Sequence, residues 1–86
     1  MSFVVRSTDL EWRQIDDEVV MLDTREGTYL ALNSSAAQLW TALAAGASRE
    51  ELAGILVETY GIEMRQATED ADEFISSLAE RGLLAA

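Results

Sequence analysis

Two acidic side chains in the last third of the chain are spaced so that they could do chemistry together. Asp70 and Glu73 lie three residues apart, which places them about one turn from each other on a helix. Two carboxylates at this spacing can serve as general acid and base, or they can bind a hard cation. The neighbouring sequence supplies no loop glycine and no third ligand, so we interpret the pair as part of a solvated helix face.

The composition removes the other common routes to catalysis. The 86 residues include no histidine and no cysteine, so the commonest general base, the thiolate nucleophile and most zinc sites are excluded. Ser76 and Ser77 fall in the middle of a predicted helix with no base to activate them. We therefore expect a protein that is not an enzyme and that uses no metal and no cofactor.

The net charge of −10 limits the partners. A surface this acidic repels phosphate backbones and anionic membranes and favours a basic or neutral partner. No apolar run approaches the ~18 residues of a membrane span. We expect a single cytoplasmic domain over residues 1–86 that binds neither nucleic acid nor membranes.

The first part of the chain predicts three short strands at residues 10–15, 18–23 and 28–32. Asp16 and Asp17 form the first turn, and residues 24–27, which end in Gly27, have the length of a hairpin loop. The near-continuous apolar run of residues 18–23 predicts the central strand of an antiparallel meander. The edge at residues 10–15 carries Glu11 and Arg13, and residues 3–6 could cover it further.

The rest of the chain predicts three helices. The first has three candidate caps and a Ser35–Gln38 pair at capping-box spacing, and it ends at Gly46; the second begins with the Ser48–Glu51 pair and ends at Gly61. The third runs over residues 64–81 and ends at Gly82, and Leu83 and Leu84 fold back onto the core. The sequence thus predicts an α+β fold, a three-stranded antiparallel sheet followed by three helices, as in a winged helix-turn-helix.

The third strand forms an unprotected edge. Its residues are β-formers or neutral, and none is a lysine, a proline or an inward charge of the kind that blunts an edge strand: Thr28, Tyr29, Leu30, Ala31 and Leu32. An apolar edge of this kind predicts a docking site.

A winged helix usually binds DNA, but the charges of the predicted helices oppose that function. The second helix offers only Arg49 against three glutamates, and the third offers Arg65 and Arg81 against five acidic residues. A DNA-reading face is expected to be basic, because it must neutralise phosphates.

An ordered set of residues from Val19 to Leu84 resembles the PqqD-like family, the leader-peptide recognition elements of ribosomally made and post-translationally modified peptides. The matching positions are a glycine, a strand ending in Leu32-Asn33, an alanine-rich helix with Trp40 and Gly46, Ser48-x-x-Glu51-Leu52, Tyr60-Gly61, and Asp70-x-x-x-Phe74-Ile75-x-x-Leu78-x-x-x-Gly82-Leu83-Leu84. Leu22-Asp23 before the turn and Tyr29 after it are similar to the stand-alone recognition proteins of lasso peptide clusters.

The resemblance implies a non-catalytic adaptor that binds the leader of a precursor peptide. The leader would add as an antiparallel strand to the third strand of the wing, in a cleft against the third helix, for presentation to a leader peptidase and a cyclase. The implied peptide-binding residues are the third-strand residues Thr28, Tyr29, Leu30, Ala31 and Leu32 together with the third-helix residues Asp70, Ala71, Asp72, Glu73, Phe74, Ile75 and Leu78. The three acidic residues would attract a basic residue of the leader at the rim.

Three questions stay open at the level of sequence. The groove could lie on the flank of the third helix that presents Asp72, Ile75 and Ala79, or on the flank that presents Asp70, Ser77 and Arg81. Either alternate set of the third strand could turn its backbone outward. A winged-helix regulator and a dimerisation module remain alternative functions.

Overall fold

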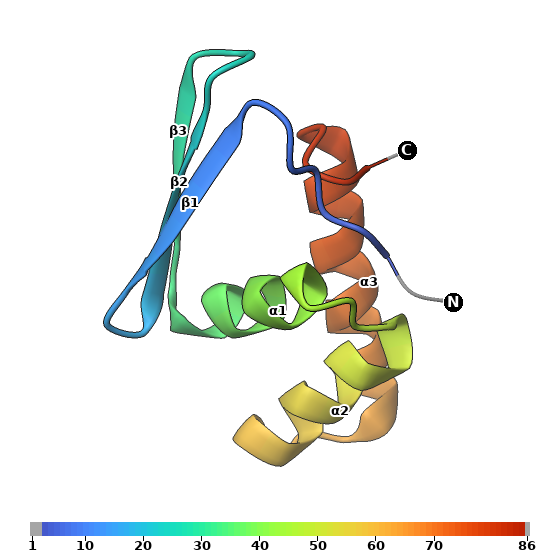
Figure 1. The fold of residues 1–86 in the computed structure, drawn as a ribbon. Helices are drawn as coiled ribbons and strands as arrows, with labels where there is room; N and C mark the ends of the chain where they lie inside the picture. The colour runs from blue at the N-terminus through green and yellow to red at the C-terminus, as the bar shows by residue number, and fades with distance from the viewer. Residues whose placement is uncertain (1–2, 86) are drawn as a thin grey trace.

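The computed structural model describes residues 3–85, which form a three-stranded sheet followed by three helices (Figure 1). The predicted α+β architecture is confirmed. The elements are β1 (Leu10–Ile15), β2 (Glu18–Asp23), β3 (Thr28–Leu32), α1 (Ser34–Ala44), α2 (Arg49–Tyr60) and α3 (Met64–Glu80). All three strands have their predicted bounds.

The sheet has the order β1-β2-β3, and both strand pairs are antiparallel. Met21 in the central strand lies opposite Trp12 of β1 and Leu30 of β3. One face of β2 is buried, whereas Leu22 on the other face is 39% exposed. The apolar run of β2 therefore belongs to a strand that is flanked by two others and is covered on one face only.

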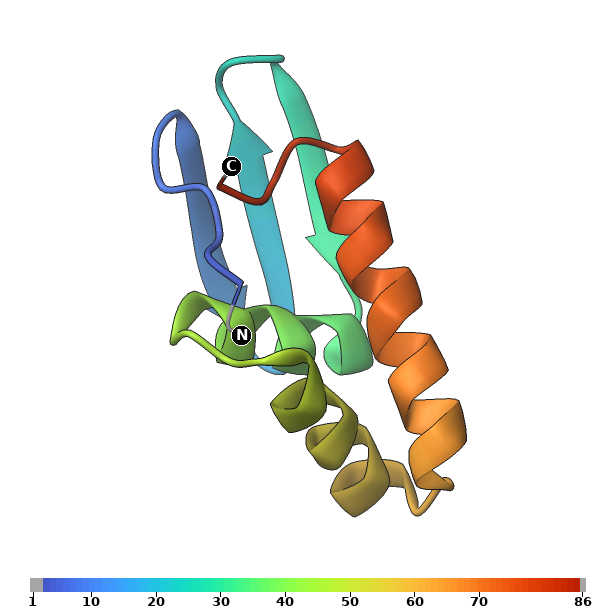
Figure 2. The ribbon, with the colours of Figure 1, turned by 90° about the vertical axis from the view of Figure 1, so that its right-hand side faces the viewer.

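Helix α1 packs on the buried face of the sheet. Trp40 of α1 is fully buried at the centre of the core and contacts Trp12 of β1 edge to face, with ring centroids 5.9 Å apart. Figure 2 shows α1 across the lower end of the sheet and α3 running upward beside β3, with α2 packed below against α3. The buried stripe of α3 consists of Ala67, Ala71 and Leu78.

The helix caps confirm one sequence prediction and correct another. The Ser48–Glu51 capping box begins α2, and Gly61 ends that helix at φ 65°. The predicted Ser35–Gln38 box is wrong, because Asn33 caps α1 by accepting from the Ala36 N–H at 3.1 Å. Gln38 instead donates to the hydroxyl of Thr59 in α2.

The N-terminal segment pairs with the C-terminal segment and not with β1, so the expected cover of the β1 edge is wrong. Val5 and Leu84 form an antiparallel bridge, flanked by hydrogen bonds from the Arg6 N–H to the Leu83 carbonyl and from the Ala85 N–H to the Val4 carbonyl, each 2.8 Å long. The buried Leu83 confirms that this tail folds back onto the core.

Candidate functional site

The backbone orientation of β3 follows from the ladder between β1 and β2. The Thr24 N–H donates to the Asp9 carbonyl at 3.0 Å, which extends that ladder by one residue pair. In an antiparallel strand, successive residues turn their N–H and C=O groups to opposite edges. Since Thr24 turns toward β1, Met21 turns toward β3 and exchanges hydrogen bonds with Leu30, its partner in the register.

Tyr29 and Ala31 therefore turn their backbone groups away from the sheet. They are the neighbours of Leu30 on either side, so their N–H and C=O groups point to the free edge of β3. Apart from the bonds within helices and strand ladders, no backbone hydrogen bond of residues 3–85 engages these four groups. The edge can pair with one further extended segment.

The side chains of β3 alternate between the two faces of the sheet. Leu30 and Leu32 face the helices and are half-buried and buried, respectively. Tyr29 is 69% exposed and lines a shallow depression of the outer face beside Arg13 and Leu22, and it also borders the small cavity beside Arg81. An added strand would thus have one set of side chains directed toward α3 and the other set toward the outer face.

One flank of α3 faces β3. Asp70 and Phe74 line a cavity together with residues of α1, and Arg81 lines a small cavity together with Thr28 and Leu30. With Ser77, which lies between them on the helix, these residues recur at helical spacing and form a stripe of Asp70, Phe74, Ser77 and Arg81, here called the groove flank. Of the two flanks left open by the sequence, this is the one whose residues line cavities with α1 and β3.

An apolar cavity of about 480 Å³ lies at the lower end of the groove flank. It opens between α3 and the N-terminal half of α1, where Ala36 and Leu39 meet Phe74, and α2 closes it with Leu56 and Tyr60. Its volume is in the range that takes a large side chain or small ligand. Asp70 and Asn33 at its wall supply polar groups.

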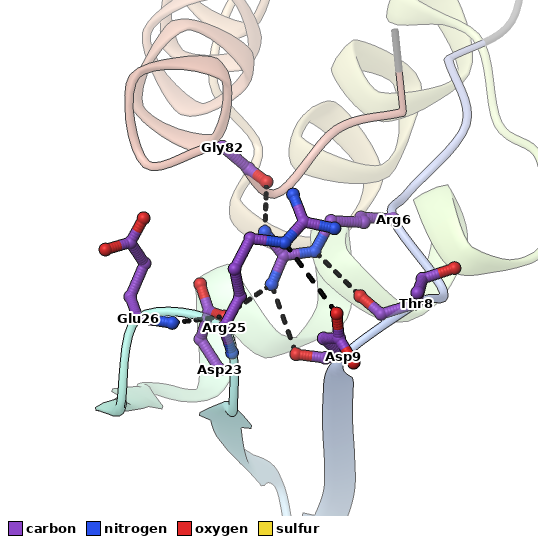
Figure 3. Close-up of polar contacts among 7 residues, drawn as sticks. All are labelled: Arg6, Thr8, Asp9, Asp23, Arg25, Glu26 and Gly82. Atoms are coloured by element: carbon purple, nitrogen blue, oxygen red, sulfur yellow. Dashed lines mark hydrogen bonds and ion pairs between the residues drawn. The ribbon is translucent and has the colours of Figure 1, made fainter.

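A buried ion pair lies near the other end of the groove flank (Figure 3). The Arg6 guanidinium lies 2.6 Å from the Asp23 carboxylate at the end of β2, and both side chains are less than 10% exposed. The same guanidinium donates to the Gly82 carbonyl at 2.9 Å and to the Thr8 carbonyl at 3.0 Å. Arg6 thus links the N-terminal segment, the end of β2 and the end of α3.

Asp23 is held in its charged form by this network. Burial raises the pKa of Asp23, but hydrogen bonds from Arg6 and from the backbone N–H groups of Glu26 and Arg25 outweigh that effect. The net result is a pKa below the usual range of an aspartate.

The structure separates the α3 residues implied by the family resemblance into three groups. Asp70 and Phe74 lie on the groove flank, and Glu73 is exposed next to it. Ala71 and Leu78 are buried in the core, where they can support the groove but cannot touch a ligand. On the opposite flank of the helix are Ile75 and Asp72.

Asp72 has a partner within the chain. Arg49 of α2 forms a two-pronged contact with its carboxylate, and this hydrogen-bonded pair lowers the pKa of Asp72. A carboxylate that is already paired, on the far flank, is poorly placed to attract a basic ligand to the edge of β3.

Sequence reasoning missed several residues of the site. The cavity at the lower end draws on Asn33, Ser35, Ala36, Leu39, Leu56, Tyr60 and Ile62. At the opposite end is Arg81, which the sequence named only as a member of one alternative flank. The i, i+4, i+7, i+11 spacing from Asp70 to Arg81 was the available signal for the flank. Nothing local to α1 or α2 marks their contribution, because it depends on how the helices meet.

The arrangement is suited to binding an extended peptide. Ser76 and Ser77 are exposed on α3. Within residues 3–85, no three acidic side chains come together as a metal site would require, and no helix is both long and apolar enough to cross a bilayer. The chemistry that the site does offer is four outward backbone groups, an apolar cavity and a charge at either end of one helix flank.

Comparison with known proteins gives two kinds of match. Residues 18–84 match the family model of PqqD, described as coenzyme PQQ synthesis protein D. A solved structure of TbiB1 in complex with the TbiA(beta) leader peptide is 30% identical, with 93% of each chain covered and a TM-score of 0.86. A structure of lasso peptide synthetase B1 complexed with the leader peptide is 32% identical, with 98% of each chain covered and a TM-score of 0.86. A comparison with curated protein sequences found no match.

Proposed function

Because the chain belongs to the PqqD family, we propose that it is a recognition element that binds the leader of a ribosomally made precursor peptide in a lasso peptide pathway. Two similar structures, at 30% and 32% identity, are described as complexes with leader peptides. The observation that carries the proposal in this chain is the free edge of β3, where Tyr29 and Ala31 turn their backbone groups outward beside the groove flank of α3.

The leader binds as a fourth, antiparallel strand next to β3. Its backbone exchanges hydrogen bonds with Tyr29 and Ala31, which supplies affinity that does not depend on sequence. Alternate side chains of the leader enter the groove and contact Leu30 and Phe74, and one large side chain enters the cavity of about 480 Å³. These contacts supply selectivity.

The protein acts as an adaptor and not as an enzyme. It works in the cytoplasm as a single domain, and it presents the bound precursor to a leader peptidase and then to a cyclase. The absence of histidine and cysteine from the sequence agrees with a role in binding. The acidic charge disfavours the alternative function of a DNA-binding regulator.

A direct binding measurement tests the proposal. The probe is the TbiA(beta) leader peptide labelled with fluorescein. We expect saturable anisotropy with micromolar or tighter affinity, and no binding of a scrambled peptide of the same composition. Equal binding of the native and scrambled peptides, or retardation of duplex DNA at micromolar protein, would contradict the proposal.

A further inference from the structure

We propose that the groove selects a directional charge pattern in the peptide: a basic residue, an apolar residue two positions later and an acidic residue two positions after that. This inference rests on the proposed function and adds the chemistry of the ligand and its direction. It follows from the register of β3 together with the two ends of the groove flank of α3.

The register fixes which peptide side chains face α3. A strand that exchanges hydrogen bonds with Tyr29 and Ala31 places the side chains of those partner residues on the outer face, like Tyr29 itself. The peptide residues opposite Leu32, Leu30 and Thr28 then direct their side chains toward α3. Groove-facing positions therefore recur at every second residue, as three positions i, i+2 and i+4.

The antiparallel direction fixes the order of these positions. β3 runs from Thr28, beside Arg81, to Leu32, which leads into the cap of α1 beside the cavity of Asp70. An antiparallel peptide begins at the Leu32 end and finishes at the Thr28 end. Position i thus meets Asp70, and position i+4 meets Arg81.

The lengths of the two elements agree with this assignment. Four residues of extended peptide span about 13 Å. Asp70 and Arg81 lie eleven positions apart, which corresponds to about 16 Å along a helix. Flexible basic and acidic side chains at i and i+4 can reach both ends.

Arg81 is available for a peptide carboxylate. Three of the six arginines already pair with aspartates, in Arg6–Asp23, Arg25–Asp9 and Arg49–Asp72. Arg81 is exposed, has no carboxylate partner within residues 3–85, and lines the small cavity beside Thr28 and Leu30. In a chain of net charge −10, a cation at this place gives an acidic peptide residue a local partner.

Asp70 offers the opposite charge at the other end. It is half-buried at the wall of the apolar cavity, where the only hydrogen bond to its carboxylate among residues 3–85 is from the Gln66 side-chain amide, at 2.8 Å. The exposed Glu73 lies next to it and adds negative charge. Between the two ends, Phe74 and Leu30 present apolar surface to position i+2.

The test uses two peptides that differ only in the order of two charges. Both share one extended sequence with an apolar residue at i+2. One carries lysine at i and glutamate at i+4, and the other carries the reverse. We expect the lysine-first peptide to bind about five- to tenfold more tightly, since the reversal replaces two favourable contacts by two like-charge contacts.

A charge-reversed protein supplies the second half of the test. Arg81→Glu combined with Asp70→Lys keeps the net charge and should invert the preference. The matched control, Arg65→Glu combined with Glu69→Lys, exchanges the same charges at exposed positions of α3 off the groove flank and should leave the preference unchanged. If circular dichroism shows that the double variant folds poorly, Arg81→Gln replaces it in the test and should reduce the preference.

The outcomes separate this inference from the proposed function. Equal binding of both peptides to the parent, or a preference for the glutamate-first peptide, would overturn the directional pattern and leave leader binding intact. No binding of either peptide would overturn both proposals. If the preference persists in the Arg81→Glu, Asp70→Lys protein, other residues cause it, and the roles proposed for Asp70 and Arg81 are wrong.

Discussion

Arg6 and Asp23 form a buried ion pair, 2.6 Å apart, that joins the N-terminal segment to the end of β2. Because Arg6 also donates to Gly82, the same side chain holds the end of α3 against the sheet. Arg81 and the start of β3 line a small cavity together with Asp23 of this pair. The pair therefore sets the separation between the strand and the helix at one end of the groove.

Arg6→Met should destabilise the domain strongly. The change removes the guanidinium and all its N–H donors. It leaves the buried Asp23 carboxylate without its counter-ion and the Gly82 carbonyl without the hydrogen bond from Arg6. Since each 1 kcal/mol lost lowers the Tm of a domain of this size by about 4–8 °C, the loss should be plain in a thermal melt. The matched control is Arg25→Met, whose pair with Asp9 spans 3.8 Å and is half exposed. Equal Tm losses in the two variants would contradict a special role for Arg6.

The same pair should make the stability sensitive to acid. The pKa of Asp23 is lowered in the folded state, so its contribution is fully present above the unfolded-state pKa of about 3.9 and is lost as the pH falls through the lower folded-state value. The Tm difference between the parent and Asp23→Asn should therefore be largest near pH 6 and shrink as the pH falls below about 4. A difference that stays constant or grows toward pH 3 would mean that the charge on Asp23 does not stabilise the fold.

The strands were predictable because their ends carry local signals. The Asp16–Asp17 turn and Gly27, at φ 69°, mark the two hairpins, and the alternation between them fixes which residues pair. The position of the free edge follows from the same signals. Which backbone groups point outward required one observed hydrogen bond, from Thr24 to Asp9.

The α3 side of the site depended on packing that no local pattern reveals. The rotation of α3 is set by the burial of Ala67, Ala71 and Leu78, and this rotation places Asp70 on the groove flank and Asp72 on the other. The sequence did not mark Arg6 as part of a buried ion pair, because Asp23 and Gly82 lie 17 and 76 residues further along the chain. Long-range partners of this kind are settled only when the chain is folded.

The cavity beside α1 should determine how well a large leader side chain is accepted. Ala36→Phe places a ring at the cavity wall, so we expect leader affinity to fall about tenfold or more while the fold persists. Ala42→Phe is the matched control, because Ala42 is also a half-buried alanine of α1 but lines other cavities. Anisotropy with the leader probe and circular dichroism measure both properties. Equal affinity of Ala36→Phe and the parent would exclude this cavity from leader binding.

Proline at neighbouring positions of β3 should separate the edge from the ladder. Proline lacks an N–H and is tolerated on an edge strand where that group faces outward. Ala31 faces outward, so Ala31→Pro should keep the circular dichroism of the parent. It should lower leader affinity about tenfold or more, through a lost hydrogen bond of ~0.5–1.5 kcal/mol and steric misfit.

Leu30→Pro should give the opposite result. Leu30 exchanges hydrogen bonds with Met21, so proline there removes a ladder bond and should lower the free energy of unfolding of the whole domain. Leu30→Ala controls for the lost side-chain packing, because it keeps the N–H. The difference in Tm between Leu30→Pro and Leu30→Ala then measures the backbone effect alone. If Ala31→Pro binds the leader as well as the parent does, strand addition at this edge is wrong, and the cavity between the helices becomes the binding site.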